Sequence, residues 1–385
     1  MKRTLFTDEH EEFRASFRTF LEREIAPHRE EWDEQRLVPH DAFRAAGAAG
    51  FLGMAVPEEF GGAGIDDFRL NVVQAEEIQR LGLMGFGMGL GLHNDLCMPY
   101  LLEYTTPEQK ERWLPGVVSG DLLPSIAMTE PGTGSDLAGI ATKAIKGDDG
   151  DYRVDGAKTF ISSGLNTNLV IAAVKTDPAE RHRGLSLLVI EGDTPGFERG
   201  RKLDKIGLPA QDTAELFFTD ARVPAANLLG EEGQGFRYLS ANLAQERMSI
   251  AVQGVSAADA AIAWTVDYVR ERTAFGKPIG TLQNTRFVLA ELRTEVDVAQ
   301  AFVDRCTEEL VDGTLSAEDA AKAKWWCSEM QGRVVDRCLQ LFGGYGYMTE
   351  YPIARSYQDA RITRIYGGTT EIMKEIIGRS MQLGG

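Results

Sequence analysis

Two stretches of the chain hold residue types that acid–base chemistry requires. Residues 242–247 place a carboxylate, Glu246, beside a guanidinium, Arg247, in a run that is otherwise apolar at helical spacing. Residues 365–372 follow much later, and they combine glycines, threonines and another carboxylate. A charged pair of this kind is more often an exposed helix face than a catalytic site. A carboxylate buried in apolar surroundings can nevertheless act as a general base near neutral pH, because burial raises its pKa.

Two further stretches are suited to binding a ligand with a flat polar ring. Residues 129–136 read TEPGTGSD, where the glycines allow a close backbone approach and Thr129 and Ser135 supply hydroxyls. Phe160 and Ser162 are two residues apart, so a strand would place both on one face, one for stacking and one for hydrogen bonding. Each pattern alone is also typical of a tight turn or a half-buried strand. The sequence has no GxGxxG fingerprint and no Walker A motif, which argues against a Rossmann or P-loop fold.

Composition excludes several classes of protein. The 385 residues suffice for two or three domains, and a net charge of −17 argues against nucleic-acid binding. The four cysteines show no CxxC spacing and the five histidines no HExxH spacing, so we expect reduced thiols and no metal site. We find no signal-peptide pattern at the N-terminus and no uncharged apolar run of about 18 residues. These absences predict a cytoplasmic protein without a membrane span.

Hydrophobic periodicity divides the chain into an α, β, α order. Residues 1–122 are predicted to form a helical domain, and residues 236–385 a second one. Between them, residues 123–235 show short apolar runs separated by Gly, Asp and Pro, which predicts an antiparallel β barrel or sandwich. Asp149–Gly150 and Asp155–Gly156 are both interpreted as hairpin turns.

The C-terminal segment contains three long helical patterns, which are predicted at residues 236–272, 282–312 and 316–342 and are long enough for a helix bundle. In the N-terminal segment, residues 82–91 alternate glycines with apolar residues. This glycine-rich stretch has two interpretations of equal weight: a close helix–helix contact, or a wall trimmed of side chains beside which a long apolar ligand could lie.

Taken together and in this order, these segments resemble the acyl-CoA dehydrogenase family of flavoproteins. The resemblance is carried by residues 129–136, by QLFGGYGY at 340–347 with EYP at 350–352, and by Arg272 with FGK at 275–277. Tyr366 with GTTEI at 368–372 completes the set. The resemblance covers essentially the whole chain.

The resemblance implies an α+β multidomain fold: a helical N-terminal domain, a middle antiparallel β barrel or sandwich, and a C-terminal four-helix bundle. It also implies FAD between the β domain and the bundle, and a homo-oligomer, a tetramer or a dimer. Phe160 and Ser162 would face the flavin ring, where many relatives have Trp and Thr, and Arg272 and Phe275 would reach the FAD of a neighbouring subunit. The implied cofactor-binding residues are Met128, Thr129, Gly134, Ser135, Phe160, Ser162, Arg272, Phe275, Gln283, Gln340, Gly343, Gly344, Thr369 and Glu371.

The reaction implied by the resemblance is α,β-dehydrogenation of an acyl-CoA thioester to a trans-2-enoyl-CoA. A base removes the α-proton while the β-hydride passes to flavin N5. Most relatives carry that base as a glutamate after the tyrosine of the last signature, but here this position is Gly367. Either the chain has lost the activity, or Glu246 supplies the carboxylate, as in the long-chain and isovaleryl branches. Ser135, Arg247, Gly367 and Gly368 would then contact the substrate.

Residues 207–218 and 366–375 resemble the long-chain branch most closely, which implies a medium- or long-chain fatty acyl-CoA as substrate and an electron-transfer flavoprotein as electron acceptor. Three alternatives remain open at this stage. The chain could be an isovaleryl or other branched-chain enzyme, a flavin oxidase or monooxygenase on the same scaffold, or a paralogue without catalytic activity.

Overall fold

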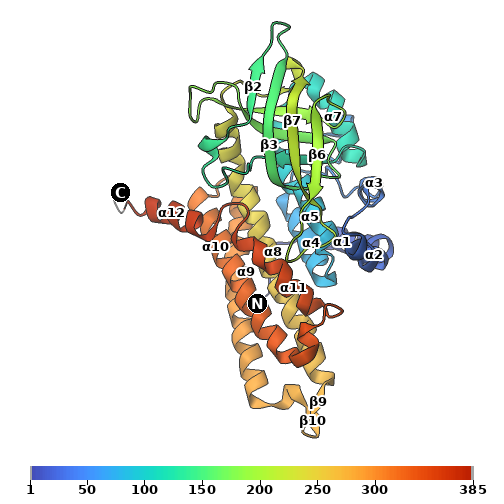
Figure 1. Cartoon of the computed structure of the whole chain (residues 1–385). Coiled ribbons are helices and arrows are strands. Elements are labelled where there is room, and N and C mark those ends of the chain that lie inside the picture. The colour runs from blue at the N-terminus through green and yellow to red at the C-terminus, as the bar shows by residue number, and fades with distance from the viewer. Residues whose placement is uncertain (1, 383–385) are drawn as a thin grey trace.

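The computed structural model describes residues 2–382, and helices flank a β domain in the chain order (Figure 1). The N-terminal helices run through residue 119, with π-helical turns at Leu21–Ile25 and Leu92–Cys97. Their bounds are α1 Asp8–Phe20, α2 Arg29–Gln35, α3 His40–Ala48, α4 Phe68–Leu81, α5 Met84–Gly91, α6 Met98–Glu103 and α7 Pro107–Ser119.

The glycine-rich stretch forms α5, and its glycines serve close packing. A methyl group on Gly85, Gly87 or Gly89 would lie less than 3 Å from Ala210, Ile78 or Phe43 respectively. The interpretation as a close helix–helix contact therefore holds for Gly87 and Gly89, which face α4 and α3, whereas Gly85 packs against the connection between β6 and β7. Gly91 differs, because a methyl group there would meet only polar side-chain atoms, at 3.4 Å and beyond.

The middle part of the chain is one twisted sheet with the strand order β6-β7-β3-β2-β4-β5-β8, and β1 pairs with β4 (Figure 1). Most neighbours are antiparallel, whereas β1 and β2 both run parallel to β4. The bounds are β1 Pro124–Ala127, β2 Lys143–Lys146, β3 Tyr152–Ser162, β4 Leu169–Lys175, β5 Leu185–Glu191, β6 Phe197–Lys202, β7 Thr213–Val223 and β8 Leu228–Leu229.

One of the two turn predictions is wrong. Asp149–Gly150 lies in the connection between β2 and β3, as expected for a hairpin turn. Asp155–Gly156 instead lies inside β3, where the register with β7 shifts. Gly156 has φ +153°, and a methyl group on it would lie 2.5 Å from Oγ1 of Thr142. The glycine therefore marks a bulge where two backbone segments approach closely, which sequence alone does not distinguish from a turn.

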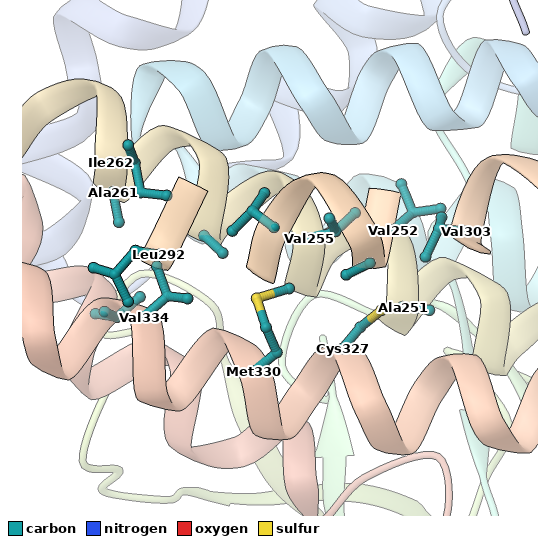
Figure 2. Close-up of a cluster of buried hydrophobic side chains, with 14 of the residues drawn as sticks. Ala251, Val252, Val255, Ala261, Ile262, Leu292, Val303, Cys327, Met330 and Val334 are labelled. Carbon is teal, nitrogen blue, oxygen red and sulfur yellow. The ribbon is translucent and has the colours of Figure 1, made fainter. Parts of the chain in front are cut away.

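The C-terminal helices pack lengthwise around a continuous apolar core, part of which Figure 2 shows between α8, α9 and α10. The helices are α8 Gly235–Glu271, α9 Gln283–Val311, α10 Ala317–Phe342, α11 Pro352–Ala360 and α12 Thr370–Ser380, and the hairpin β9 Thr273–Ala274 with β10 Lys277–Pro278 joins α8 to α9. The three long helices agree within one residue with the ranges predicted from periodicity.

By length and composition, α8 is the one helix among the described residues that could cross a membrane. In its most apolar window, however, 78% of the helix is buried inside the protein. The apolar face of α8 thus packs in the core of the bundle. The helix runs from the β domain to the β9–β10 hairpin at the far end of the bundle (Figure 1).

Candidate active site

The first turns of α8 carry Glu246 into the interior of the protein. Its side chain is 3% exposed, and Oε1 accepts a hydrogen bond of 3.0 Å from the Tyr100 hydroxyl on α6. Burial raises the pKa of Glu246 to about 7, while the Tyr100 hydrogen bond and the Arg247 charge act in the opposite direction. The carboxyl group is therefore poised to take up a proton at neutral pH, which is the requirement for a general base.

The loop before α12 lies beside this part of α8. Gly367 has φ +63°, and a methyl group built on it would lie 2.3 Å from Cδ1 of Ile250, one helical turn beyond Glu246. A side chain at position 367 would thus need both a strained backbone and a displacement of the Ile250 side-chain end. The helix that carries the Glu246 carboxylate also carries Ile250, whose side chain occupies the space beside Gly367.

Two buried cations flank the loop. Lys324 on α10 donates a hydrogen bond of 2.5 Å from Nζ to the carbonyl oxygen of Gly368. Burial and the neighbouring Arg247 charge lower the pKa of Lys324 to about 8. The Arg247 guanidinium is 5% exposed, and its Nε has no hydrogen-bond partner among the described residues. Lys324 therefore anchors the loop directly, and Arg247 contributes a charge beside the carboxylate.

A buried ion pair fixes the loop that follows β1. Lys158 on β3 is fully buried, and its Nζ donates to Glu130 Oε1 at 2.8 Å and to the carbonyl oxygen of Met128 at 3.2 Å. The Glu130 carboxylate also accepts the backbone N–H groups of residues 141 and 142. Lys158 and Glu130 thus hold the residue 128–135 loop against the sheet.

The surface beside this loop is open and aromatic. Phe160 has φ +59° and is 67% exposed, which is unusual for a large apolar side chain in a strand. Met128, Thr129 and Ser162 are half-buried, and Gly134 and Ser135 are exposed. Among the described residues, no heavy atom lies within 4 Å of a methyl group built on Gly132 or Gly134. A planar ring with polar edges fits this combination of exposed aromatic and bare backbone.

The other predicted cofactor residues lie elsewhere. At the far end of the bundle the Arg272 guanidinium lies 5.5 Å from the centre of the Tyr345 ring, and Phe275 is 92% exposed at the hairpin tip (Figure 1). Gln283, Gln340, Gly343 and Gly344 are exposed at the same end. Thr369 caps α12 and Glu371 is in its first turn, near Lys324 rather than Gln340. Within one chain, the predicted cofactor residues therefore form three separate groups: one around residues 128–162, one at the far end of the bundle and one at the start of α12.

Two cavities adjoin the site and share the side chains of Met84 and Gln253. The first is lined by Tyr366, which precedes the glycine loop and donates a hydrogen bond of 3.3 Å to Gln253 Oε1. The second lies between α4, α5 and α8 and includes Gly87, Gly91 and Asp95. Gln253, which lines both cavities, lies on α8 about two turns beyond Glu246.

Sequence reasoning missed Tyr100, Lys324, Ile250 and Lys158. Each is a single residue in a regular helix or strand, without a local pattern that marks it. Lys158 and Lys324 stand out only because they are buried lysines with unusual partners. The sequence around a single lysine in a regular helix or strand does not show that it is buried. Their roles arise from contacts across long sequence separations, such as that between Tyr100 and Glu246.

Comparison with known proteins establishes the family. Models of the N-terminal, middle and C-terminal domains of acyl-CoA dehydrogenase match residues 7–121, 125–221 and 233–382. The mitochondrial long-chain specific acyl-CoA dehydrogenase of Sus scrofa is 45% identical, over 98% of this chain and 88% of the relative. A crystal structure of an acyl-CoA dehydrogenase from Geobacillus kaustophilus has a TM-score of 0.96 and 49% identity, covering 99% of this chain and 100% of that one.

The chain belongs to the acyl-CoA dehydrogenase family and is therefore a flavin-dependent oxidoreductase with FAD as its cofactor. A glutaryl-CoA dehydrogenase from Mycobacterium smegmatis, in complex with FADH2, matches with a TM-score of 0.91 and 26% identity over 98% of this chain and 95% of that one. The isovaleryl-CoA dehydrogenase of Oryza sativa subsp. japonica is 34% identical over 98% of this chain and 92% of the relative. The family thus includes more than one acyl specificity.

Proposed function

We propose that the chain dehydrogenates acyl-CoA thioesters to trans-2-enoyl-CoA, with Glu246 as the base that removes the α-proton. The observation that carries this proposal is the pairing of a buried carboxylate on α8 with a position 367 where the positive φ and the Ile250 side chain disfavour any side chain. A thioester α-proton is weakly acidic, so the base needs a raised pKa and the carbonyl oxygen needs donors. Glu246, with a pKa of about 7, meets the first requirement.

In this mechanism the backbone N–H of Gly367 donates to the thioester oxygen and stabilises the charge that develops there. Lys324 keeps the loop in place through Gly368, and Ser135 and Arg247 border the substrate. Residues 128–135 with Phe160 and Ser162 hold the flavin ring. FAD held there would supply the acceptor for the β-hydride. The proton stays on the Glu246 carboxylate until product leaves.

The proposal is tested by adding acyl-CoA anaerobically and following the bleaching of the flavin. Straight-chain substrates from butyryl- to stearoyl-CoA and isovaleryl-CoA should be compared. The two cavities beyond Tyr366 favour medium or long chains, so we expect kcat/KM to rise toward these chains. If kcat/KM is highest for the shortest acyl chains, the protein is a short-chain enzyme. If it is highest for isovaleryl-CoA, the protein is a branched-chain enzyme. Rapid peroxide formation with oxygen as the only acceptor would favour an oxidase.

Two partners are part of the proposal. The separation of Arg272 and Phe275 from Phe160 in one chain supports a homo-oligomer, a tetramer or a dimer, in which the hairpin of one subunit reaches the cofactor of another. An electron-transfer flavoprotein would accept the electrons. Deleting the Phe275 ring by Phe275→Ala should therefore weaken FAD retention in the assembled protein, although Phe275 is 92% exposed within its own chain.

Removing the hydroxyl of Tyr100 should shift the pH dependence of flavin reduction. The Tyr100 hydrogen bond favours the ionised form of Glu246, so Tyr100→Phe raises the pKa of the carboxyl above about 7. The acid limb of the rate should move upward by about one pH unit, the value of one hydrogen bond to a charge. Tyr104→Phe is the matched control, because the Tyr104 ring packs on Tyr100 without a bond to Glu246. An unmoved limb in Tyr100→Phe would contradict Glu246 as the base.

Restoring a glutamate at the usual family position should not rescue the enzyme. In Glu246→Gln/Gly367→Glu, the new side chain meets Ile250 and a backbone at φ +63°, so the rate should stay within about tenfold of Glu246→Gln alone. Adding Ile250→Ala removes the obstructing carbons and should raise the rate of flavin reduction. Full recovery without the Ile250 change would show that the loop moves freely.

A further inference from the structure

The wall of the second cavity is more polar than a plain alkyl chain requires. Asp95, Asn71, Gln74 and Gln253 line it together with apolar residues of α4 and α5. Asp95 is 6% exposed and belongs to the π-helical turn Leu92–Cys97 that follows α5. Such turns re-aim side chains within a helix and are frequent at functional sites. Here the turn directs a carboxylate toward the interior.

A hydrogen-bond acceptor and a donor converge on the bare backbone of Gly91. A methyl group at that position would lie 3.4 Å from Gln253 Nε2 and 3.6 Å from Asp95 Oδ2. Asn71 Nδ2 donates to Asp95 Oδ1 at 2.5 Å and Ser249 Oγ to Oδ2 at 2.6 Å, so each oxygen retains capacity for another donor. Gln253 uses Oε1 for the Tyr366 hydroxyl, and Nε2 has no hydrogen bond among the described residues.

A hydroxyl group matches this pair, because it can donate to Asp95 and accept from Gln253 at the same time. An alkyl chain in the same place would leave Gln253 Nε2 desolvated without a partner and would give the buried Asp95 carboxylate no donor beyond Asn71 and Ser249, which weakens binding. Burial raises the pKa of Asp95 to about 6, so the group is mostly ionised and an acceptor at neutral pH. The pair thus distinguishes an oxygenated chain from a hydrocarbon one.

The pair lies at a defined depth from the proposed base. Ser249, which binds Asp95, is three residues beyond Glu246 on α8, and Gln253 is seven residues beyond it. At the rise of a helix these positions are about 4.5 Å and about 10 Å along the axis. For an acyl chain that runs along α8 from Glu246, the contact point therefore falls several carbons past the reacting Cα and Cβ.

We propose that Asp95 and Gln253, over Gly91, form a hydroxyl-binding subsite, and that the substrate class is acyl-CoA thioesters with a hydroxyl group on the chain beyond Cβ. This inference rests on the proposed dehydrogenation. Asp95 and Gln253 determine specificity and take no part in bond breaking, so the reaction itself is unchanged. An unsubstituted chain remains a substrate of lower kcat/KM.

The test uses the FAD-loaded enzyme and acyl-CoAs of a single chain length. One is unsubstituted, and the others carry one hydroxyl at successive carbons from C4 outward. For the wild type, kcat/KM should peak at one or two adjacent positions and exceed the unsubstituted value by about tenfold or more. Asp95→Leu should abolish that peak, so that kcat/KM of every hydroxylated chain falls to about the value of the unsubstituted chain in the same variant.

Gly91→Ala tests the same subsite without altering a charge. Alanine is favourable in a helix, and its methyl group would occupy the space between Asp95 and Gln253. It should also abolish the hydroxyl preference, and it carries the test if Asp95→Leu does not fold. Gln79→Leu is the matched control, since it removes a polar group from the first cavity and should leave the preference intact.

The outcomes separate the two proposals. If the wild type turns over the unsubstituted chain as well as every hydroxylated one, the subsite holds only water and this inference is overturned, while the proposed dehydrogenation stands. If neither kind of acyl-CoA bleaches the flavin, the proposed function itself fails. A hydroxyl preference that survives both Asp95→Leu and Gly91→Ala would place recognition elsewhere and also overturn the inference.

Discussion

Glu246→Gln is expected to suppress flavin reduction by acyl-CoA by about 10²–10⁴-fold, the contribution typical of a general base. Glutamine keeps the shape of the side chain and can still accept from Tyr100, but it cannot take up the α-proton. Substrate binding and flavin content should stay close to those of the wild type. Glutamine has nearly the same size as glutamate, and Glu246 is not among the residues expected to bind FAD. The measurement is the rate of anaerobic bleaching in a stopped-flow instrument.

The wild-type rate should also depend on pH in a way that Glu246→Gln lacks. Since the pKa of Glu246 is raised to about 7, the fraction of ionised base, and the rate, should rise as the pH passes through that value. Asp267→Asn is the matched control on the same helix, with a side chain 75% exposed and paired only with Arg270. Normal bleaching in Glu246→Gln would assign the base to another group.

The raised pKa of Glu246 also predicts how the stability of the folded protein changes with pH. The folded-state pKa of Glu246 is raised from 4.5 to about 7, so the folded state favours the neutral acid, and stability is lost as the pH rises from about 4.5 through about 7. Glu246→Gln removes this loss. Its Tm should match the wild type below about pH 4.5 and exceed it at pH 8, when both are measured by thermal unfolding with FAD bound. An equal Tm at pH 8 would mean that Glu246 ionises without cost.

Lys158→Met is expected to lower the free energy of unfolding by about 3–5 kcal/mol, which is the usual cost of breaking a buried ion pair from one side. The Glu130 carboxylate would remain 6% exposed and lose its cation. The carbonyl oxygens of Met128 and Ala173 would lose a donor as well. The 128–135 loop should loosen, so FAD should dissociate more readily. Thermal unfolding and the FAD content after dialysis measure the two effects.

A double-mutant cycle separates the ion pair from general damage to the sheet. Glu130→Gln alone should cost a comparable amount, because Lys158 would remain fully buried beside a neutral amide. The double variant Lys158→Met/Glu130→Gln removes both charges, so its loss should be clearly smaller than the sum of the single losses. Strict additivity would show that the two groups act independently and that the ion pair does not hold the loop.

The sequence by itself determined the order of the three parts, the long bundle helices and the family. These features depend on local periodicity and on short segments such as residues 129–136 and 340–347, which are readable without contacts. It also singled out Glu246 as the proposed base, since Gly367 has no side chain. The turn at Asp149–Gly150 was local in the same sense.

Tertiary structure alone decided which residues surround these positions. Only packing brings the Tyr100 hydroxyl to Glu246 and the Ile250 side chain to the space above Gly367. The bulge at Gly156 depends on how closely Thr142 approaches it, which a dipeptide does not encode. The physical reason is common to all three cases. Burial and backbone approach are properties of contacts between distant segments, whereas a sequence pattern reports only the preferences of neighbouring residues.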